Sequence, residues 1–180
     1  MKHRYFNILF SLIVLSIFSL IDLGEPYTYI GISIGMLFML FFPFVDSAWQ
    51  KPDLSLNKVT FSVYLVFLLI LILVVFNLQK WQLIVSSLLF AALPEEWFFR
   101  SYLLLRINQL LNKPWLANIL TSIVFSLLHL PTQGWFGLSV FFPSLVFGWF
   151  YQKTNNLLLV IGLHALSNAA FYIYLKDLMN

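Results

Sequence analysis

The sequence contains no cysteine, which excludes disulfide bonds, thiol catalysis and cysteine-ligated metal sites. Charged residues are also scarce, at 9% of the 180 residues, whereas about a quarter is usual in a soluble domain. Because so few charges cannot cover a water-facing surface, lipid must surround most of the protein. The basic residues are scattered singly and form no phosphate-binding cluster, which argues against a nucleic-acid partner.

What the sequence has in abundance is apolar residues, which make up 61% of the chain. They fall into runs close to the roughly 20 residues that a membrane-crossing helix needs. The predicted fold is therefore all-α, a polytopic transmembrane bundle of about seven helices in a single membrane domain over residues 1–180. The expected spans are 5–21, 27–45, 59–78, 81–111, 114–130, 135–152 and 156–175.

The distribution of basic residues predicts how this integral membrane protein is oriented. With the N-terminus inside, the residues on the cytoplasmic side are Lys2, Arg4, Lys51, Lys58, Arg106, Lys113 and Lys153. Only Lys80 and Lys176 then lie outside, and this bias favours the N-in orientation. In a bacterium the membrane would be the cytoplasmic (inner) membrane. Arg106, Lys113 and Lys153 are interpreted as interface anchors.

Ionisable residues interrupt one of the apolar runs. The segment PEEWFFR places Glu95, Glu96 and Arg100 among apolar side chains. Each such group costs about 2.5–3.5 kcal/mol at the bilayer centre, so we expect these residues to have a function. Glu96 and Arg100 are four residues apart and can pair on one helix face, which leaves Glu95 without a partner in its own segment. Pro94 is expected to start or kink the helix.

Two later segments carry complementary polar groups. FSLLH places His129 one turn after Phe125, and HALSN places Asn168 one turn after His164. At about 1.5 Å per residue, Glu95 and His129 lie roughly 27 and 24 Å from the nearest basic loop residue. His164 and Asn168 lie about 16 and 22 Å from theirs, so all four groups are expected in one slab of the membrane.

These residue types are the parts that amide hydrolysis needs. A carboxylate in an apolar cavity is a competent general base for water, and a neutral histidine beside it can hold that water. A second histidine and an asparagine can donate hydrogen bonds to an oxyanion, which commonly contributes a few kcal/mol of transition-state stabilisation.

The three segments resemble the EExxxR, FxxxH and HxxxN motifs of the CPBP family. That family comprises the type II CAAX prenyl endopeptidases and related bacterial bacteriocin-processing or immunity proteins. The resemblance covers about 93–168, including a stretch at 147–168 that is similar to the last two helices of the family. It implies a catalytic helical core over 81–175, preceded by N-terminal helices over 1–80. The position after the motif arginine, often glycine in the family, is Ser101, which is expected to tighten helix packing.

The resemblance implies a glutamate-type intramembrane protease acting on a membrane-embedded or lipidated polypeptide. In such an enzyme Glu95 and His129 would activate water, and His164 and Asn168 would form the oxyanion site. The predicted catalytic residues are Glu95, Glu96, Arg100, His129, His164 and Asn168. No cofactor is expected to be required, since no HExxH motif occurs. If zinc did bind, its ligands would be Glu95, His129 and His164.

Other interpretations of the same residues remain open. A catalytically silent relative would act as a membrane peptide-binding or immunity protein. A proton-coupled transporter ranks last, because the sequence has no internal repeat. A purely structural interpretation makes Glu95, Glu96 and Arg100 a buried ion-pair network or an ion pathway. The string GISIG at 31–35 fits GxSxG, but it lies inside an apolar helix and is not interpreted as a nucleophile elbow.

Overall fold

A computed structural model describes residues 2–21, 30–54 and 81–175, together with Ser62, Leu65, Val66 and Leu69. Every regular element in this part of the chain is helical, which confirms the predicted all-α class. The count of seven helices stays a prediction, because most of the expected span 59–78 lies outside the described residues. Lys58, Lys80 and Lys176, which enter the predicted orientation, lie outside them as well.

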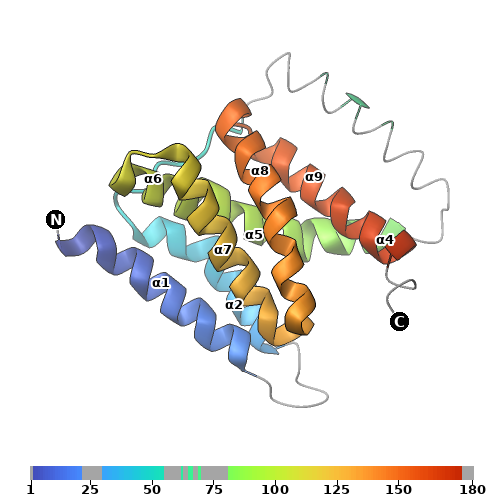
Figure 1. Ribbon diagram of the computed structural model, residues 1–180, viewed down its shortest axis with the longest axis horizontal. Helices are drawn as coiled ribbons and strands as arrows, with labels where there is room; N and C mark the ends of the chain where they lie inside the picture. Colours follow the sequence, from blue (N-terminus) through green and yellow to red (C-terminus); the bar gives the residue numbers. More distant parts are fainter. Residues whose placement is uncertain are drawn as a thin grey trace.

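The helices form a bundle around the segment that holds the carboxylates (Figure 1). The N-terminal part contributes α1 (Lys2–Leu20), α2 (Ile30–Phe41) and the 3-10 turn η1 (Phe42–Val45). One continuous helical run then comprises α4 (Trp81–Ser87), η3 (Leu88–Ala92), α5 (Leu93–Phe98), η4 (Phe99–Leu104) and α6 (Leu105–Leu111). It is followed by α7 (Pro114–Gln133), η5 (Gly134–Val140), α8 (Phe141–Thr154), α9 (Leu157–Ala170) and η6 (Phe171–Leu175).

The short helix α5 is bounded by wider helical turns. Both η3 and η4 are π-helical, a geometry that is often found at functional sites. Pro94 occupies the first turn of α5, next to the preceding π turn. The π-helical turn before it accommodates the proline within the continuous run, so the predicted local change of geometry occurs without ending the helix. As a result, Glu95 and Glu96 lie on a short helix between two irregular segments.

The hairpin of α7 and α8 corrects the predicted loop at 131–134. Helix α7 runs through Pro131 to Gln133, and the chain reverses at Gly134, whose φ is 59°. Glycine adopts such a left-handed conformation at little cost, which explains why the turn begins there and not at the proline. Beyond the turn, α7 and α8 pack side by side (Figure 1).

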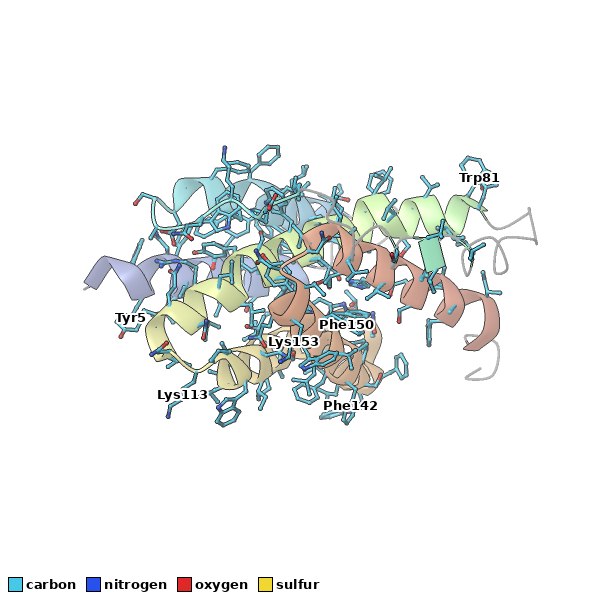
Figure 2. All side chains as sticks on the ribbon, turned by 90° about the horizontal axis from the view of Figure 1, so that it is seen from above. Tyr5, Trp81, Lys113, Phe142, Phe150 and Lys153 are labelled. Carbon is cyan, nitrogen blue, oxygen red and sulfur yellow. The ribbon has the colours of Figure 1, made fainter. Side chains whose placement is uncertain are left out.

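The exterior of the described part is more apolar than that of a soluble protein. Large apolar side chains face outward, such as Trp135 at 84% exposure and Val45 at 74%. Figure 2 shows Trp81, also exposed, at one end of the long axis, with Tyr5 and Lys113 toward the other. The buried polar residues include Glu96, Arg100, Ser101, Arg106, Asn118, Thr121, Ser122, Ser144 and His164. An apolar exterior that encloses buried charged and polar side chains fits a lipid environment.

Length and composition identify the membrane-crossing candidates among the described helices. One stretch, Pro114–Thr154, is long and apolar enough to cross a bilayer, and it contains α7, η5 and α8. Three shorter apolar helices are Tyr5–Leu20, Ile30–Val45 and Leu157–Ile173. These four stretches coincide in position with five of the predicted spans, since Pro114–Thr154 covers both 114–130 and 135–152.

The predicted role of Arg106 as an interface anchor is wrong. Its side chain is buried, and its Nε donates to Asp46 Oδ2 at 2.9 Å. The hydroxyl of Tyr102 donates to the same oxygen at 3.2 Å. The reason is that the segment after η1 folds back over the helical run and supplies a carboxylate. Burial by itself raises the pKa of Asp46, but the hydrogen bond from the Ala48 amide and the charge of Arg106 lower it overall.

Candidate active site

Glu96 and Arg100 form a fully buried ion pair, as their spacing predicted. Arg100 Nε donates to Glu96 Oε2 at 2.7 Å, one helical turn apart. Arg100 Nη2 donates to Ser144 Oγ of α8 at 2.9 Å. The guanidinium carbon also lies 5.7 Å from the centre of the Phe125 ring. These contacts tie the α5–η4 segment to α7 and α8.

His164 of α9 lies between the two carboxylates. Its Nδ1 is 2.8 Å from Glu96 Oε1, and because a carboxylate accepts, Nδ1 carries the proton of this hydrogen bond. On the other side of the ring, Nε2 is 3.6 Å from Glu95 Oε2, which is beyond direct hydrogen-bond distance. Phe147 of α8 stacks on the imidazole with a centroid separation of 5.3 Å. The ring is therefore oriented by Glu96 and faces Glu95.

His129 is held in one tautomer by its own helix. Its Nδ1 lies 2.8 Å from the carbonyl oxygen of Phe125, which can only accept, so Nδ1 is the protonated nitrogen. In the neutral ring Nε2 then has a free lone pair that can accept a hydrogen bond. The backbone of His129 is pressed against Gly137, where an ideal Cβ would lie 2.7 Å from the His129 carbonyl carbon. Only glycine allows η5 to approach His129 this closely.

Glu95 and His129 line the same cavity, whose volume is about 100 Å³. That volume accommodates several water molecules. The Glu95 side chain is 13% exposed, whereas Glu96 is fully buried. The cavity is walled by α1 and α2 on one side and by α5, η4 and α7 on the other. Glu95 is thus the carboxylate that faces open space, and Glu96 the one that is enclosed by protein.

The family model of type II CAAX prenyl endopeptidase Rce1-like proteins matches residues 77–170, just over half of the chain. The chain belongs to this family. No curated protein and no solved structure matches it. Membership in the Rce1-like family implies a membrane-integral peptidase, and the match spans all six predicted catalytic residues.

Asn168 is the least engaged of the six residues in this Rce1-like protein. It lies one turn after His164 on α9 and is partly buried. Within the described part of the chain its side-chain amide has no hydrogen-bond partner, and neither Asn168 nor His164 is among the residues that line the cavity.

The described residues contain no cluster of three or more His, Asp or Glu side chains arranged to hold a metal ion. Glu95, His129 and His164, the predicted ligands of a zinc ion if one bound, are not placed as such a group. The nitrogen of His164 nearest Glu95 is 3.6 Å away from it, while Nδ1 of His129 is already bonded to Phe125. The absence of a metal requirement stays a prediction.

Two supporting residues were missed or understood only in part. Ser144 was not predicted, although an isolated hydroxyl in the apolar segment FFPSLVF was a signal of the same kind as the carboxylates. Ser101 is buried as its packing role suggested, and its hydroxyl donates to the carbonyl of Trp97. Its own carbonyl accepts from Trp49 Nε1 at 2.7 Å, which fastens the segment after η1 to the helical run.

Proposed function

We propose that this Rce1-like protein is a glutamate-type intramembrane endopeptidase that cuts a peptide bond of a membrane-associated or lipidated polypeptide. The observation that carries the proposal is the shared cavity, in which Glu95 and His129 border one space beside a helix pair. The geometry of His164, held by Glu96 and turned toward Glu95, supports it. We further propose that the chain crosses the membrane several times with its N-terminus inside.

In the proposed mechanism, Glu95 takes a proton from a water molecule whose oxygen attacks the carbonyl carbon of the scissile bond. Nε2 of His129 accepts a hydrogen bond from the same water and orients it. The negative charge that develops on the carbonyl oxygen is stabilised by donors from His164 and Asn168. When the carbon–nitrogen bond breaks, Glu95 returns its proton to the leaving amine, and a free carboxylate and an amine result.

Charge balance supports the assignment of Glu95 as the base. A lipid-shielded cluster with uncompensated charge is costly, and here two carboxylates face one guanidinium and one imidazole. Neutrality is reached when Glu95 and His164 share one additional proton. With that proton on His164, Glu95 is ionised and can act as the base, while the imidazolium can donate to an oxyanion. The proton that Glu95 then takes from water leaves the cluster with one positive charge, which balances the negative charge of the oxyanion.

The first test compares Glu95→Gln and His129→Ala with the unmodified protein. Loss of a general base typically lowers a rate by about 10²–10⁴-fold, so we expect cleavage to fall at least that far for Glu95→Gln. Membrane insertion and thermal unfolding in detergent should change little, since Glu95 faces the cavity. Asp53→Asn, at an exposed position that does not line the cavity, is the matched control and should cleave normally. Cleavage at the wild-type rate by either Glu95→Gln or His129→Ala rejects the mechanism. A cellular phenotype that is retained by both variants indicates a catalytically silent peptide-binding or immunity protein.

A second test concerns metal. We propose that no metal is required, so activity should be fully retained after exhaustive chelation. Loss of activity on chelation, with recovery on adding zinc, overturns this part of the proposal.

A third test locates the face of the membrane to which the site opens. The estimated depth of Glu95 and His129 favours access from the outside and hence an exported substrate. Thr132 borders the cavity, and the sequence lacks cysteine, so Thr132→Cys gives a single labelling site. We expect modification by an impermeant thiol reagent added from outside. Labelling only from the cytoplasmic side reverses the assignment.

A further inference from the structure

One wall of the cavity comes from outside the family match. The match begins at residue 77, whereas cavity-lining residues such as Ser19, Gly35 and Met39 belong to α1 and α2. The opposite wall carries Glu95 and His129. The reacting groups and the surface facing them therefore lie in different parts of the chain, only one of which shares the family's sequence pattern.

The two glycines of the GISIG string contribute differently to this wall. A Cβ at Gly31 would lie 3.0 Å from the carbonyl oxygens of Phe18 and Ile21, so Gly31 allows α1 and α2 to pack closely. A Cβ at Gly35 would meet one heavy atom within 4 Å, the Cβ of Phe18 at 3.5 Å, which is an ordinary contact. Gly35 is nevertheless buried and lines the cavity. A methyl group at this position therefore fits against α1, and a larger side chain would take up space at the cavity wall.

We propose that Gly35 sets the size of the substrate residue accepted beside the scissile bond, so that α1 and α2 hold the selectivity of the enzyme. This inference rests on the proposed peptidase function. The cavity of about 100 Å³ also receives Met36 and Met39 from α2, which are flexible, apolar side chains. At Gly35 the wall is backbone and cannot change shape, whereas the two methionine side chains can adjust to a bound residue.

The experiment uses a library of quenched fluorescent peptides in detergent micelles, varied at the two residues that flank the scissile bond. Cleavage products of Gly35→Ala and Gly35→Leu are compared with those of the unmodified full-length protein by mass spectrometry. Discrimination by one methylene in an apolar pocket reaches about 10–200-fold. We expect Gly35→Leu to lower kcat/KM for large residues relative to alanine or glycine by at least about tenfold, and Gly35→Ala to shift the ratio in the same direction by less.

Ser33→Leu is the matched control, because Ser33 lies on the exposed side of the same helix and does not line the cavity. Its cleavage profile should equal that of the unmodified protein. If Gly35→Leu does not fold, Gly35→Ala still decides, since its added methyl group fits at 3.5 Å. An unchanged size preference in a folded, active Gly35 variant rejects the inference. Failure of the unmodified protein to cleave any peptide, with activity absent from membranes as well, counts against the proposed function itself.

Discussion

Two buried ion pairs are each formed by an arginine of the same helical run, Arg100 or Arg106, but they differ in the parts of the protein that they connect. Glu96–Arg100 joins residues one turn apart, and its carboxylate also holds His164. Asp46–Arg106 joins residues sixty positions apart, and its carboxylate receives Tyr102 and the Ala48 amide. The first pair orients the ring of His164, which faces Glu95. The second fastens a connecting segment to the helix bundle.

The comparison teaches that buried charge in this protein does not by itself mark the site. Both pairs are almost inaccessible, and both carry neighbouring polar groups. What separates them is their surroundings: the first adjoins Glu95 and the cavity, and the second lies where the chain leaves η1. Variants of the two pairs should therefore separate effects on cleavage from effects on folding.

The largest effect is expected for Arg100→Leu. Removing one partner of a buried pair leaves an uncompensated charge and typically costs about 3–5 kcal/mol. We expect a strongly lowered unfolding midpoint in detergent and loss of cleavage, because Glu96 no longer has a fixed charge partner while it holds His164. The double variant Glu96→Gln, Arg100→Leu should regain much of the stability and none of the activity. Recovery of cleavage in the double variant would show that the pair only supports folding.

Asp46→Asn should have a smaller effect on stability and little effect on cleavage. Asparagine keeps the shape and one acceptor, but a hydrogen bond to a charged group is worth about 1.5–3 kcal/mol, and Arg106 loses its counter-charge. The measurement is the unfolding midpoint together with kcat/KM on any cleaved peptide. A loss of kcat/KM as large as that of Arg100→Leu would contradict the separation of the two pairs.

Lowering the pH should destabilise the protein partly in the way that Asp46→Asn does, because protonation also removes the charge of Asp46. Because the pKa of Asp46 is lowered in the folded protein, the unfolded chain binds its proton more tightly. The ion pair therefore contributes fully above the ordinary aspartate pKa of about 3.9, and this contribution is lost as the pH falls through the lower folded value. We expect the stability difference between the unmodified protein and Asp46→Asn to be constant near neutrality and to shrink below about pH 4. A difference that grows on acidification would contradict the sign.

The sequence was sufficient to predict what depends on short-range spacing. Apolar length identified the helices, and the four-residue spacing of Glu96 and Arg100 predicted their pairing, because helix geometry alone determines both. The motifs also indicated the family that the match to 77–170 shows. The depth estimate brought Glu95 and His129 to one level, and they do border one cavity.

Features that depend on long-range packing could not be predicted in this way. Arg106 looked like an interface anchor because its partner, Asp46, is sixty positions away. Nothing in the sequence connects Ser144 or Gly35 with the carboxylates, because their proximity depends on how α8 and α2 pack against α5 and η4. The span 114–130 was ended too early, because the helix continues through Pro131 to Gln133 and the turn comes at Gly134, which has the positive φ.

The smallest effects on stability are expected when one hydroxyl group beside each ion pair is removed. These variants test most directly whether the two pairs have separate roles in cleavage and in folding. Ser144→Ala removes the acceptor of Arg100 Nη2, and Tyr102→Phe removes the donor to Asp46 while leaving the ring in its core cluster. Each hydrogen bond contributes about 0.5–1.5 kcal/mol to the free energy of unfolding, so the two variants should be destabilised similarly.

Their effects on cleavage should differ. Within the described residues Arg100 Nη1 already has no hydrogen-bond partner, so loss of Ser144 leaves Glu96 as the single hydrogen-bond partner of the guanidinium. The guanidinium can then shift, and with it the carboxylate that orients His164, so we expect Ser144→Ala to lower kcat several-fold. Tyr102→Phe has no such route to the cavity and should leave kcat unchanged. Equal kcat values for Ser144→Ala and Tyr102→Phe would mean that Arg100 does not need the hydrogen bond to Ser144. The site would then require the charge of the Glu96–Arg100 pair and not a fixed position of the guanidinium.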